Sequence, residues 1–552
     1  MDVQRVILIA ALALMSYMMV LQWNQDYNTP AAAPTVASSS VSAYAPSDSD
    51  LPSATSTASA DVPATAEATT AAVAATDASL ISVKTDTLEL LIDPRGGDVI
   101  EAKLPQHLAV LSESEPLTLL EQNATRTYVA QSGLVGKNGP DANPEGRPLY
   151  NSEARSYEMG GSDQLSVDLQ LNENGVAITK RFTFTRGSNA IKVEYLINNQ
   201  SAENFETVLF GQLKRDRSAD PSQQTDMGMQ SYLGAVFSTA ENNYQKVDFD
   251  DMDDKRFTAT SADGWVAMSQ HYFLSAWIPQ PGQTYTYQTR VLNGLYIAGF
   301  LAPAVNVAPG QQTTLSSTLY AGPKDTDQLE QVATDLDLTI DYGILWFVAS
   351  PLYMLLKWIY SIVGNWGLAI IGVTLLIKIA LFQLNAKAFK SMAKMRKFGP
   401  EMARLKELYG DDRQKMSQEM MKLYSKEKIN PLGGCLPIVA QMPIFIALYW
   451  VLLESVELRH APFYGYIQDL SQMDPYFILP LLMGASMFVQ QLLNPTPPDP
   501  MQAKIMKMLP IIFTFFFLWF PAGLVLYWVV NNVLSIAQQY IINKQIEAGD
   551  TK

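Results

Sequence analysis

Cysteine is nearly absent from this chain of 552 residues, since Cys435 is the only one. A single cysteine excludes an intrachain disulfide, so any large exported domain must be stabilised by its own packed core. Cys435 lies inside an apolar run. A buried structural thiol is therefore the favoured interpretation, and a reactive thiol is the alternative.

Catalytic and metal-binding signatures are also missing. The sequence has no GxxxxGK[ST] phosphate loop, no HExxH metal motif and no GxSxG nucleophile elbow. Its three histidines, His107, His271 and His460, do not stand in the spacing of metal ligands. We therefore expect no enzymatic activity, no catalytic residues, no cofactor and no metal site.

An excess of positive charge, which nucleic-acid binding requires, is lacking as well. The formal net charge is −15, and neutralising phosphates needs clustered lysine and arginine. We therefore expect no specific DNA partner. The positive charge that is present is concentrated, because residues 385–432 carry twelve Lys or Arg against six acids.

Apolar runs long enough to cross a bilayer, which takes about 20 residues per helix, occur at the start of the chain and repeatedly after residue 365. The run Val6 to Leu21 predicts a transmembrane anchor over 1–25; a signal peptide is the alternative, but no small-residue cleavage pattern closely follows Leu21. Residues 26–79 are rich in Ala, Ser, Thr and Pro and predict a disordered linker.

Between 80 and 340 the pattern changes to short runs of alternating polar and apolar residues separated by turn signals. Examples are Val176 to Thr185 and Ile191 to Ile197, with the turn signals Asn172-Glu-Asn-Gly175 and Arg186-Gly-Ser-Asn189. Alternation with a period of two indicates antiparallel strands that bury one face. The segment therefore predicts an all-β sandwich domain.

The remaining chain predicts a helical bundle. Residues 341–363 contain Pro351 and Lys357 and are interpreted as an amphipathic interfacial helix, with a spanning helix as the alternative. The predicted spans are 364–384, 433–454, 475–493, 508–520 and 522–542, with a cytosolic hairpin at 385–432 and a cytosolic tail at 543–552. Lys and Arg concentrate in cytosolic loops, so the basic hairpin is placed inside and the β domain outside. The N-terminus is then cytosolic.

Polar residues inside the predicted spans gather toward the cytosolic side. Lys378 lies past the middle of its span, and Thr374 precedes it by one turn on the same face. A cation near the bilayer centre costs about 2.5 to 3.5 kcal/mol on insertion scales, so Lys378 needs water or a partner. The predicted groove residues are Lys378, Thr374, Gln441, Tyr527, Trp528, Asn531, Asn532 and Ser535.

Helices that become polar only toward the cytosol predict a wet cavity that is open to the cytosol and closed on the outer side. Two alternatives stay open. The amides and hydroxyls could simply join one helix to another by hydrogen bonds, and Lys378 could extend to the cytosolic interface. The 508–520 span is short, at about 20 Å for 1.5 Å per residue, which predicts a thinned bilayer around it.

The segment 385–432 predicts two helices broken at Gly410-Asp-Asp412, which together form a basic antiparallel hairpin. Its candidate contact residues are Lys394, Arg396, Lys397 and Arg404. They would contact lipid headgroups, nascent chains or ribosomal RNA. A charged face that is merely solvated is an equally compatible interpretation.

Several motifs in the last 200 residues resemble those of a known family. They are Gly364-Asn-Trp-Gly367, Ser391-Met-Ala-Lys-Met-Arg396, Asn430-Pro-Leu-Gly-Gly-Cys-Leu-Pro437, Gln441-Met-Pro-Ile-Phe445, Leu518-Trp-Phe-Pro521 and Gly523-Leu-Val-Leu-Tyr527. This pattern resembles the YidC/Oxa/Alb family of membrane insertases and covers residues 341–542. The anchor and the large β domain resemble the Gram-negative form of that family.

The resemblance implies a multi-domain membrane protein with an α-helical bundle of five core transmembrane helices, an N-terminal anchor helix and a periplasmic all-β supersandwich domain. It implies a membrane protein insertase and chaperone of the inner (cytoplasmic) membrane, which works without ATP, alone or with the Sec translocon (SecYEG, SecDF). The implied partners are nascent membrane proteins, the ribosome and membrane lipids. The groove would take a substrate's hydrophilic tail while its transmembrane segment slides past Thr374 and Tyr527-Trp528.

One position departs from the family pattern, because the usual groove cation is arginine and this chain has Lys378. Lysine keeps the charge but loses the bidentate fork. We therefore hypothesise that a positive point charge suffices to attract acidic substrate tails. For the β domain, a scaffold or Sec-contacting role is favoured over sugar binding, since fold alone does not assign a ligand.

Two other functions are weighed against insertion. A small-solute transporter would use the polar cavity, but it should show an internal repeat, and none is found. A membrane-anchored carbohydrate-active enzyme would need paired carboxylates in the β domain, and no convincing acid-base pair is seen there.

Overall fold

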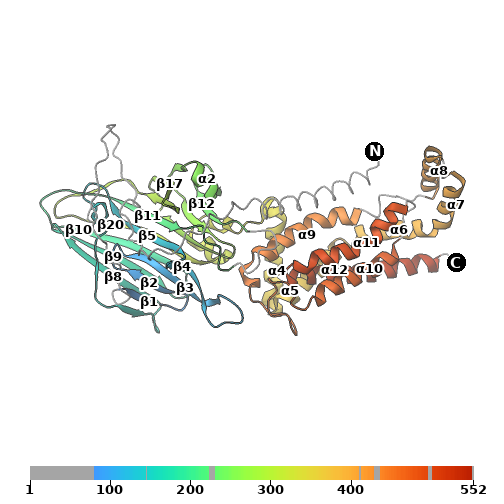
Figure 1. Cartoon of the computed structure of the whole chain (residues 1–552), viewed down its shortest axis with the longest axis horizontal. Coiled ribbons are helices and arrows are strands. Elements are labelled where there is room, and N and C mark those ends of the chain that lie inside the picture. Colours follow the sequence, from blue (N-terminus) through green and yellow to red (C-terminus); the bar gives the residue numbers. More distant parts are fainter. Residues whose placement is uncertain are drawn as a thin grey trace, which may run out of the picture. The chain divides into compact units, whose positions relative to one another are not determined.

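The structure is a computed structural model that describes residues 80–143, 146–222, 231–409, 412–427, 436–494 and 500–549. These residues belong to one compact unit of the chain. The predicted anchor and linker, residues 1–79, and Cys435 lie outside the described residues. Along the chain, a region of strands is followed by a region of helices (Figure 1).

The first region forms two largely antiparallel sheets, of eleven and nine strands. The first sheet contains β1 (Ile81–Lys84), β2 (Glu89–Asp93), β3 (Asp98–Leu108), β4 (Pro116–Gln122), β5 (Thr127–Val135), β7 (Ser156–Glu158), β11 (Phe205–Arg215), β14 (Thr258–Ser261), β17 (Tyr285–Leu292), β18 (Leu295–Leu301) and β19 (Val305–Val307). The second contains β6 (Asn151–Ser152), β8 (Gln164–Glu173), β9 (Val176–Thr185), β10 (Ala190–Asn199), β12 (Gly234–Ser238), β13 (Gln245–Val247), β15 (Trp265–Ser269), β16 (Phe273–Pro279) and β20 (Gln312–Pro323). The prediction of an all-β domain is confirmed.

The hairpin of β8 and β9 shows how the sequence fixes the register. Glu173 pairs with Val176, so only Asn174 and Gly175 form the turn. Both residues have positive φ, 52° and 78°, which is the conformation of the two-residue turn that suits the twist of the strands. Along β9 every second residue is buried, so one face of the strand is directed into the domain.

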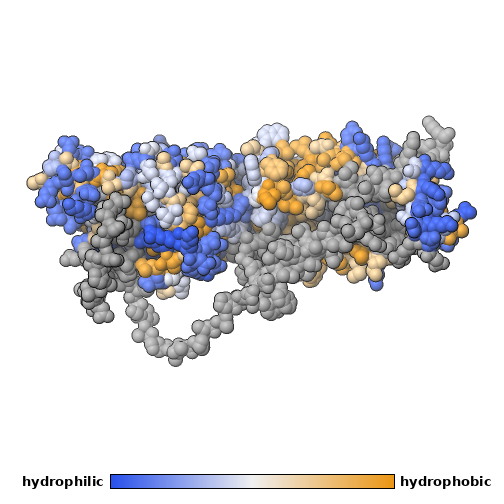
Figure 2. All heavy atoms as spheres, turned by 90° about the horizontal axis from the view of Figure 1, so that it is seen from above, coloured by the Kyte–Doolittle hydropathy of each residue, from blue (hydrophilic) through white to orange (hydrophobic). Residues whose placement is uncertain are grey.

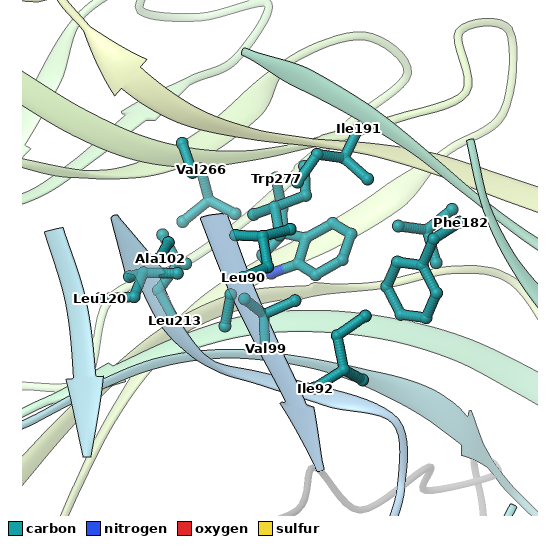
Figure 3. Packing of buried hydrophobic residues seen from close by; sticks show 14 of the residues in the cluster. Leu90, Ile92, Val99, Ala102, Leu120, Phe182, Ile191, Leu213, Val266 and Trp277 are labelled. Carbon is teal, nitrogen blue, oxygen red and sulfur yellow. The ribbon is translucent and has the colours of Figure 1, made fainter. Parts of the chain in front are cut away.

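The core of the β domain lies between the two sheets. Leu90, Val99 and Leu213 from the first sheet pack with Trp277 and Val266 from the second (Figure 3). Trp277 is 1% exposed, and its Nε1 donates to the carbonyl of Gln212 at 3.1 Å. Burying such large side chains contributes about 25 cal/mol per Å² of apolar surface, so the domain has the core that a chain without disulfides needs.

The second region is helical. Its elements are α4 (Trp346–Val363), α5 (Trp366–Ala380), α6 (Phe382–Lys397), α7 (Gly399–Tyr409), α8 (Arg413–Lys426), α9 (Leu436–Glu454), α10 (Ile478–Leu493), α11 (Pro500–Phe516) and α12 (Ala522–Gly549). Short helices α2 (Phe249–Asp254) and α3 (Thr326–Val332) precede them, and 3-10 turns include η4 (Leu336–Thr339), η5 (Gly343–Leu345), η7 (Val456–Leu458) and η8 (Phe517–Trp519).

Several helix boundaries differ from the sequence-based ranges. The predicted 364–384 span ends at Ala380, and α6 continues from it at a bend of 67°. Helix α11 begins at Pro500, eight residues before the predicted start, and α12 continues through most of the predicted tail to Gly549. Hydropathy marks only the apolar part of a helix, so it misses polar turns that continue the same backbone hydrogen bonding.

By length and apolar composition alone, one helical stretch among the described residues could cross a membrane, namely Gly343–Val363. The bent pair of α5 and α6 passes the same test only if it is taken together, and the apolar helices Val439–Glu454 and Ile478–Leu493 are shorter. On the face shown in Figure 2, hydrophobic residues gather over the helices, whereas most residues of the β domain and of α7 and α8 are hydrophilic.

Candidate substrate groove

Lys378 is held by the last helix of the chain. It lies near the end of α5, and its Nζ donates to Ser535 Oγ on α12 at 2.7 Å. Ser535 Oγ in turn donates to the Asn531 carbonyl, also at 2.7 Å, which leaves a lone pair directed at the lysine. Among the described residues no carboxylate pairs with Lys378. Its charge is therefore positioned by a neutral hydroxyl and is not neutralised.

A second contact joins α9 to α12. Gln441 Nε2 donates to Tyr527 OH at 2.6 Å, and the Tyr527 side chain is 1% exposed. Phe445, one turn after Gln441, packs edge-to-face on Trp528 with ring centroids 4.6 Å apart. Gln441 of α9 and Tyr527 of α12, both predicted groove residues, are thus in direct contact.

Two further predicted groove residues, Thr374 and Asn532, form hydrogen bonds to helix groups. Thr374 Oγ1 donates to the Ile370 carbonyl of its own helix at 2.7 Å. Asn532 Nδ2 donates to Ser486 Oγ on α10 at 2.9 Å. For Asn532, the alternative of a hydrogen bond that joins helices therefore describes the observed contact.

Other polar atoms on α12 have no partner within the described residues. Trp528 Nε1, Asn531 Oδ1 and Gln539 Oε1 are buried without a hydrogen bond. A buried polar atom left unpaired costs about 1 to 3 kcal/mol. Water or the backbone of a bound polypeptide could satisfy these atoms, so this face of α12 has unused capacity to bind polar groups.

The predicted hairpin contacts lie on two helices. Lys394, Arg396 and Lys397 are exposed near the end of α6, and Arg404 is exposed on α7. Helices α7 and α8 touch where Tyr424 OH meets Met402 Sδ at 3.6 Å. A shallow hollow along α8, lined by Gln414, Ser417, Gln418, Met421, Lys422 and Ser425, includes none of the predicted groove residues.

Sequence reasoning missed Ser486, the partner of a predicted residue, and Asn494, the partner of Gln539 further along α12. Ser486 accepts from Asn532, and Asn494 Oδ1 accepts from Gln539 Nε2 at 3.0 Å. Placing polar residues by depth in the spans could have found Ser486, which lies in an apolar run. Its small side chain also donates to the Met483 carbonyl of its own helix at 2.6 Å, so it can lie in an apolar span without a distant partner.

Solved structures give a weak likeness. An active YidC insertase crystal structure aligns over 84% of this chain and 92% of its own with 20% identity and a TM-score of 0.37. A galactose mutarotase related enzyme from Lactobacillus acidophilus aligns over 44% of this chain and 97% of its own, with 10% identity and a TM-score of 0.32. At these TM-scores neither structure supports a conclusion about this chain.

Sequence comparisons are decisive. The family model described as YidC periplasmic domain matches residues 80–355, and the one described as 60Kd inner membrane protein matches residues 358–549. The membrane protein insertase YidC of Stutzerimonas stutzeri is 57% identical, with 100% of this chain and 99% of the relative covered. That of Pseudomonas fluorescens strain SBW25 is 55% identical, with all of both chains covered. The chain therefore belongs to the YidC family of membrane protein insertases.

Proposed function

We propose that this chain integrates and folds proteins in the inner membrane of a Gram-negative bacterium. Relatives that are 55% and 57% identical over essentially their whole length carry the name membrane protein insertase. Family membership favours this function over the transporter considered from the polar cavity alone. The insertase is proposed to be non-enzymatic and to need no nucleotide.

The proposed topology has an anchor, an interfacial helix α4 and five crossing helices, α5 and α9 to α12. Two contacts support it. Lys357 lies about 17 Å from the start of α4, at 1.5 Å per residue. Its Nζ forms an ion pair with Asp327 of α3 at 2.6 Å. A residue this far along α4 that still contacts the β-domain side suits a helix that lies along the membrane surface. Arg459, in the loop after α9, donates to the Ala109 carbonyl of the β domain at 2.9 Å, so this loop and the β domain share a side.

In the proposed mechanism the groove receives the hydrophilic tail of a substrate. The observation that carries it is the Lys378 ammonium, which is held by Ser535 Oγ without a carboxylate partner. An acidic tail supplies the missing negative charge, and the unpaired polar atoms of Trp528 and Asn531 can bind its peptide groups. The apolar segment of the substrate then leaves toward lipid beside α5 and α12.

The proposed partners are nascent membrane proteins, the ribosome, the Sec translocon and membrane lipids. The exposed cations Lys394, Arg396 and Arg404 support contact of the cytosolic helices with phosphate groups, because lipid headgroups and ribosomal RNA both present them. For the β domain we propose a scaffold or Sec-contacting role.

Reconstitution of the purified full-length chain into liposomes tests the function. The assay adds a single-span test protein with a short acidic tail and scores protease protection of that tail, without nucleotide. We expect protection well above that in liposomes without the protein. Equal protection in the two samples would reject the proposed function, and a requirement for ATP would reject its non-enzymatic form.

A further inference from the structure

All three histidines of the chain lie where the β domain contacts the end of α9 and the loop that follows it. His107 is the second-last residue of β3, His271 lies in the turn between β15 and β16, and His460 follows η7. We use the name junction for these three residues with Leu453, Glu454, Arg459 and Asp469 of α9 and its following loop. Histidine is the side chain whose ordinary pKa lies nearest neutral pH.

His271 makes the most direct of these contacts. Its side chain is 7% exposed, and its Nε2 lies 2.9 Å from the carbonyl oxygen of Leu453. A carbonyl only accepts, so Nε2 carries the proton and Nδ1 is the unprotonated nitrogen of the neutral ring. Nδ1 is buried and has no partner in the described residues. A second proton would place a buried N–H there without an acceptor.

His107 and His460 both lie near Arg459. The His107 ring meets Phe273 edge-on at 5.2 Å, and the Arg459 guanidinium lies 5.6 Å from the centre of the same Phe273 ring. Burial, reinforced by Arg459 and His460, lowers the pKa of His107 to about 4. Burial and then Arg459 also lower the pKa of His460, although Asp469 opposes them. A proton on either ring adds positive charge beside a fixed cation.

The other charged groups around the three histidines do not reverse this effect. Asp220 accepts from the backbone N–H of His271 at 2.7 Å, and Glu454 accepts from Ser231 Oγ at 2.7 Å. Both carboxylates favour a charged His271, whereas the buried Lys324 opposes it, and burial is the largest effect, so the pKa of His271 is lowered. His460 Nε2 and Asp469 Oδ2 are 3.9 Å apart, too far for a hydrogen bond.

We propose that the three histidines form an acid-sensitive latch, which holds the β domain on the loop after α9 at neutral pH and releases it when the pH falls. Release exposes the rings to water, where each can accept a proton freely. The inference goes beyond insertion itself. On the proposed topology the junction is on the periplasmic side.

The direction of the pH effect on the latch follows from proton linkage. The open junction binds more protons than the closed one between the ordinary histidine pKa of 6.5 and the lowered value of about 4 for His107. Closure is therefore fully stable above about pH 6.5 and weakens as the pH falls through this window. For His107 alone, the open-to-closed ratio rises about 20-fold between neutral pH and about pH 5.

Spin labels across the junction test the latch in the full-length protein in lipid nanodiscs. Labels at Ser114→Cys and Gln468→Cys, in a Cys435→Ser background, report the distance between the β domain and the outer loop. We expect one narrow distance distribution at about pH 7.5 and a broader, longer one at about pH 5. A matched pair within the β domain, Ser114→Cys with Ser162→Cys, should not respond to pH.

The decisive variant replaces His107, His271 and His460 with glutamine, which can still donate to the Leu453 carbonyl but cannot titrate. We expect this variant to stay closed at about pH 5. A pH response that persists in the variant, or an unmodified protein that does not respond, overturns the latch. If the triple variant is already open at neutral pH, each histidine is replaced by glutamine singly. At least one single variant that is closed at neutral pH should then open less than the unmodified protein at about pH 5. If none does, the latch is rejected.

Discussion

Lys378 is a compact charge on a flexible stem, and its position depends on a hydroxyl from a distant helix. Ser535 Oγ accepts from Lys378 while it donates to the Asn531 carbonyl, so within the described residues the ammonium has one fixed partner and two N–H groups that can still donate. A lysine point charge lacks the planar fork of arginine. It can nevertheless attract a carboxylate from any direction that its stem allows.

Charge, more than shape, should therefore decide activity at this position. For substrates with acidic tails, we expect Lys378→Arg to retain insertion, Lys378→Gln to reduce it and Lys378→Glu to lower it about tenfold or more, because a carboxylate repels the tail. The measurement is the liposome protection assay. Lys507→Glu, at an exposed lysine of α11, is the control and should insert normally. Full activity of the Lys378→Glu variant would contradict the charge hypothesis.

The sequence alone identified the polar residues of the proposed groove, but it did not show which of them form hydrogen bonds with one another. Depth in the predicted spans singled out Lys378 and Ser535, because polar groups are costly in a bilayer. It could not show that Ser535 bonds to Lys378 while Asn532, three residues earlier on α12, bonds to Ser486 of α10. These pairings depend on how α12 is rotated against its neighbours, and tertiary packing sets that rotation.

At the scale of helices, α10 and α11 approach closely at Gly484. A Cβ at this position would lie 1.9 Å from Thr514 Oγ1 and 3.1 Å from Thr514 Cβ. Small residues allow such close approach of helices in membranes, where packing replaces the hydrophobic effect as the attraction between them. Thr514 itself donates to the Pro510 carbonyl at 2.7 Å, so moving its side chain would break that bond.

We expect Gly484→Leu to destabilise the bundle by about 1 to 3 kcal/mol through overpacking. Thermal unfolding of the purified protein in detergent measures the effect as a lower melting temperature. Ala485→Leu is the matched control, because Ala485 is the exposed neighbour on the same helix and tolerates a larger side chain. Equal melting temperatures for the two variants would contradict close packing of α10 on α11.

Helix ends were the least predictable elements. Apolar composition located the centres of α9, α10 and α12, but the bend between α5 and α6 lies within a run that hydropathy assigns to one span. The β strands were easier to predict, because alternation and turn residues such as Asn174-Gly175 specify both the strand and its end.

For the whole molecule, the proposed topology places the β domain and the loop after α9 on one side and helices α7 and α8 on the other. Single cysteines in a Cys435→Ser background test it in cells whose outer membrane is permeable to the reagent. We expect Ser114→Cys and Tyr464→Cys to react with a reagent that cannot cross the inner membrane. Met421→Cys, which is 60% exposed on α8 in the unmodified chain, should react only after lysis. Labelling of Met421→Cys in intact cells would contradict the topology.

The most direct test of the proposed groove is site-specific photo-crosslinking to a ribosome-stalled membrane protein. Photoreactive residues replace Trp528 and Thr374, and a third replaces Val533, which is 52% exposed on α12 and serves as the control. The groove model predicts adducts from positions 528 and 374 that form when the substrate's transmembrane segment has just left the ribosome, with few from position 533. Adducts from position 533 alone, or none from 528 and 374, would contradict it.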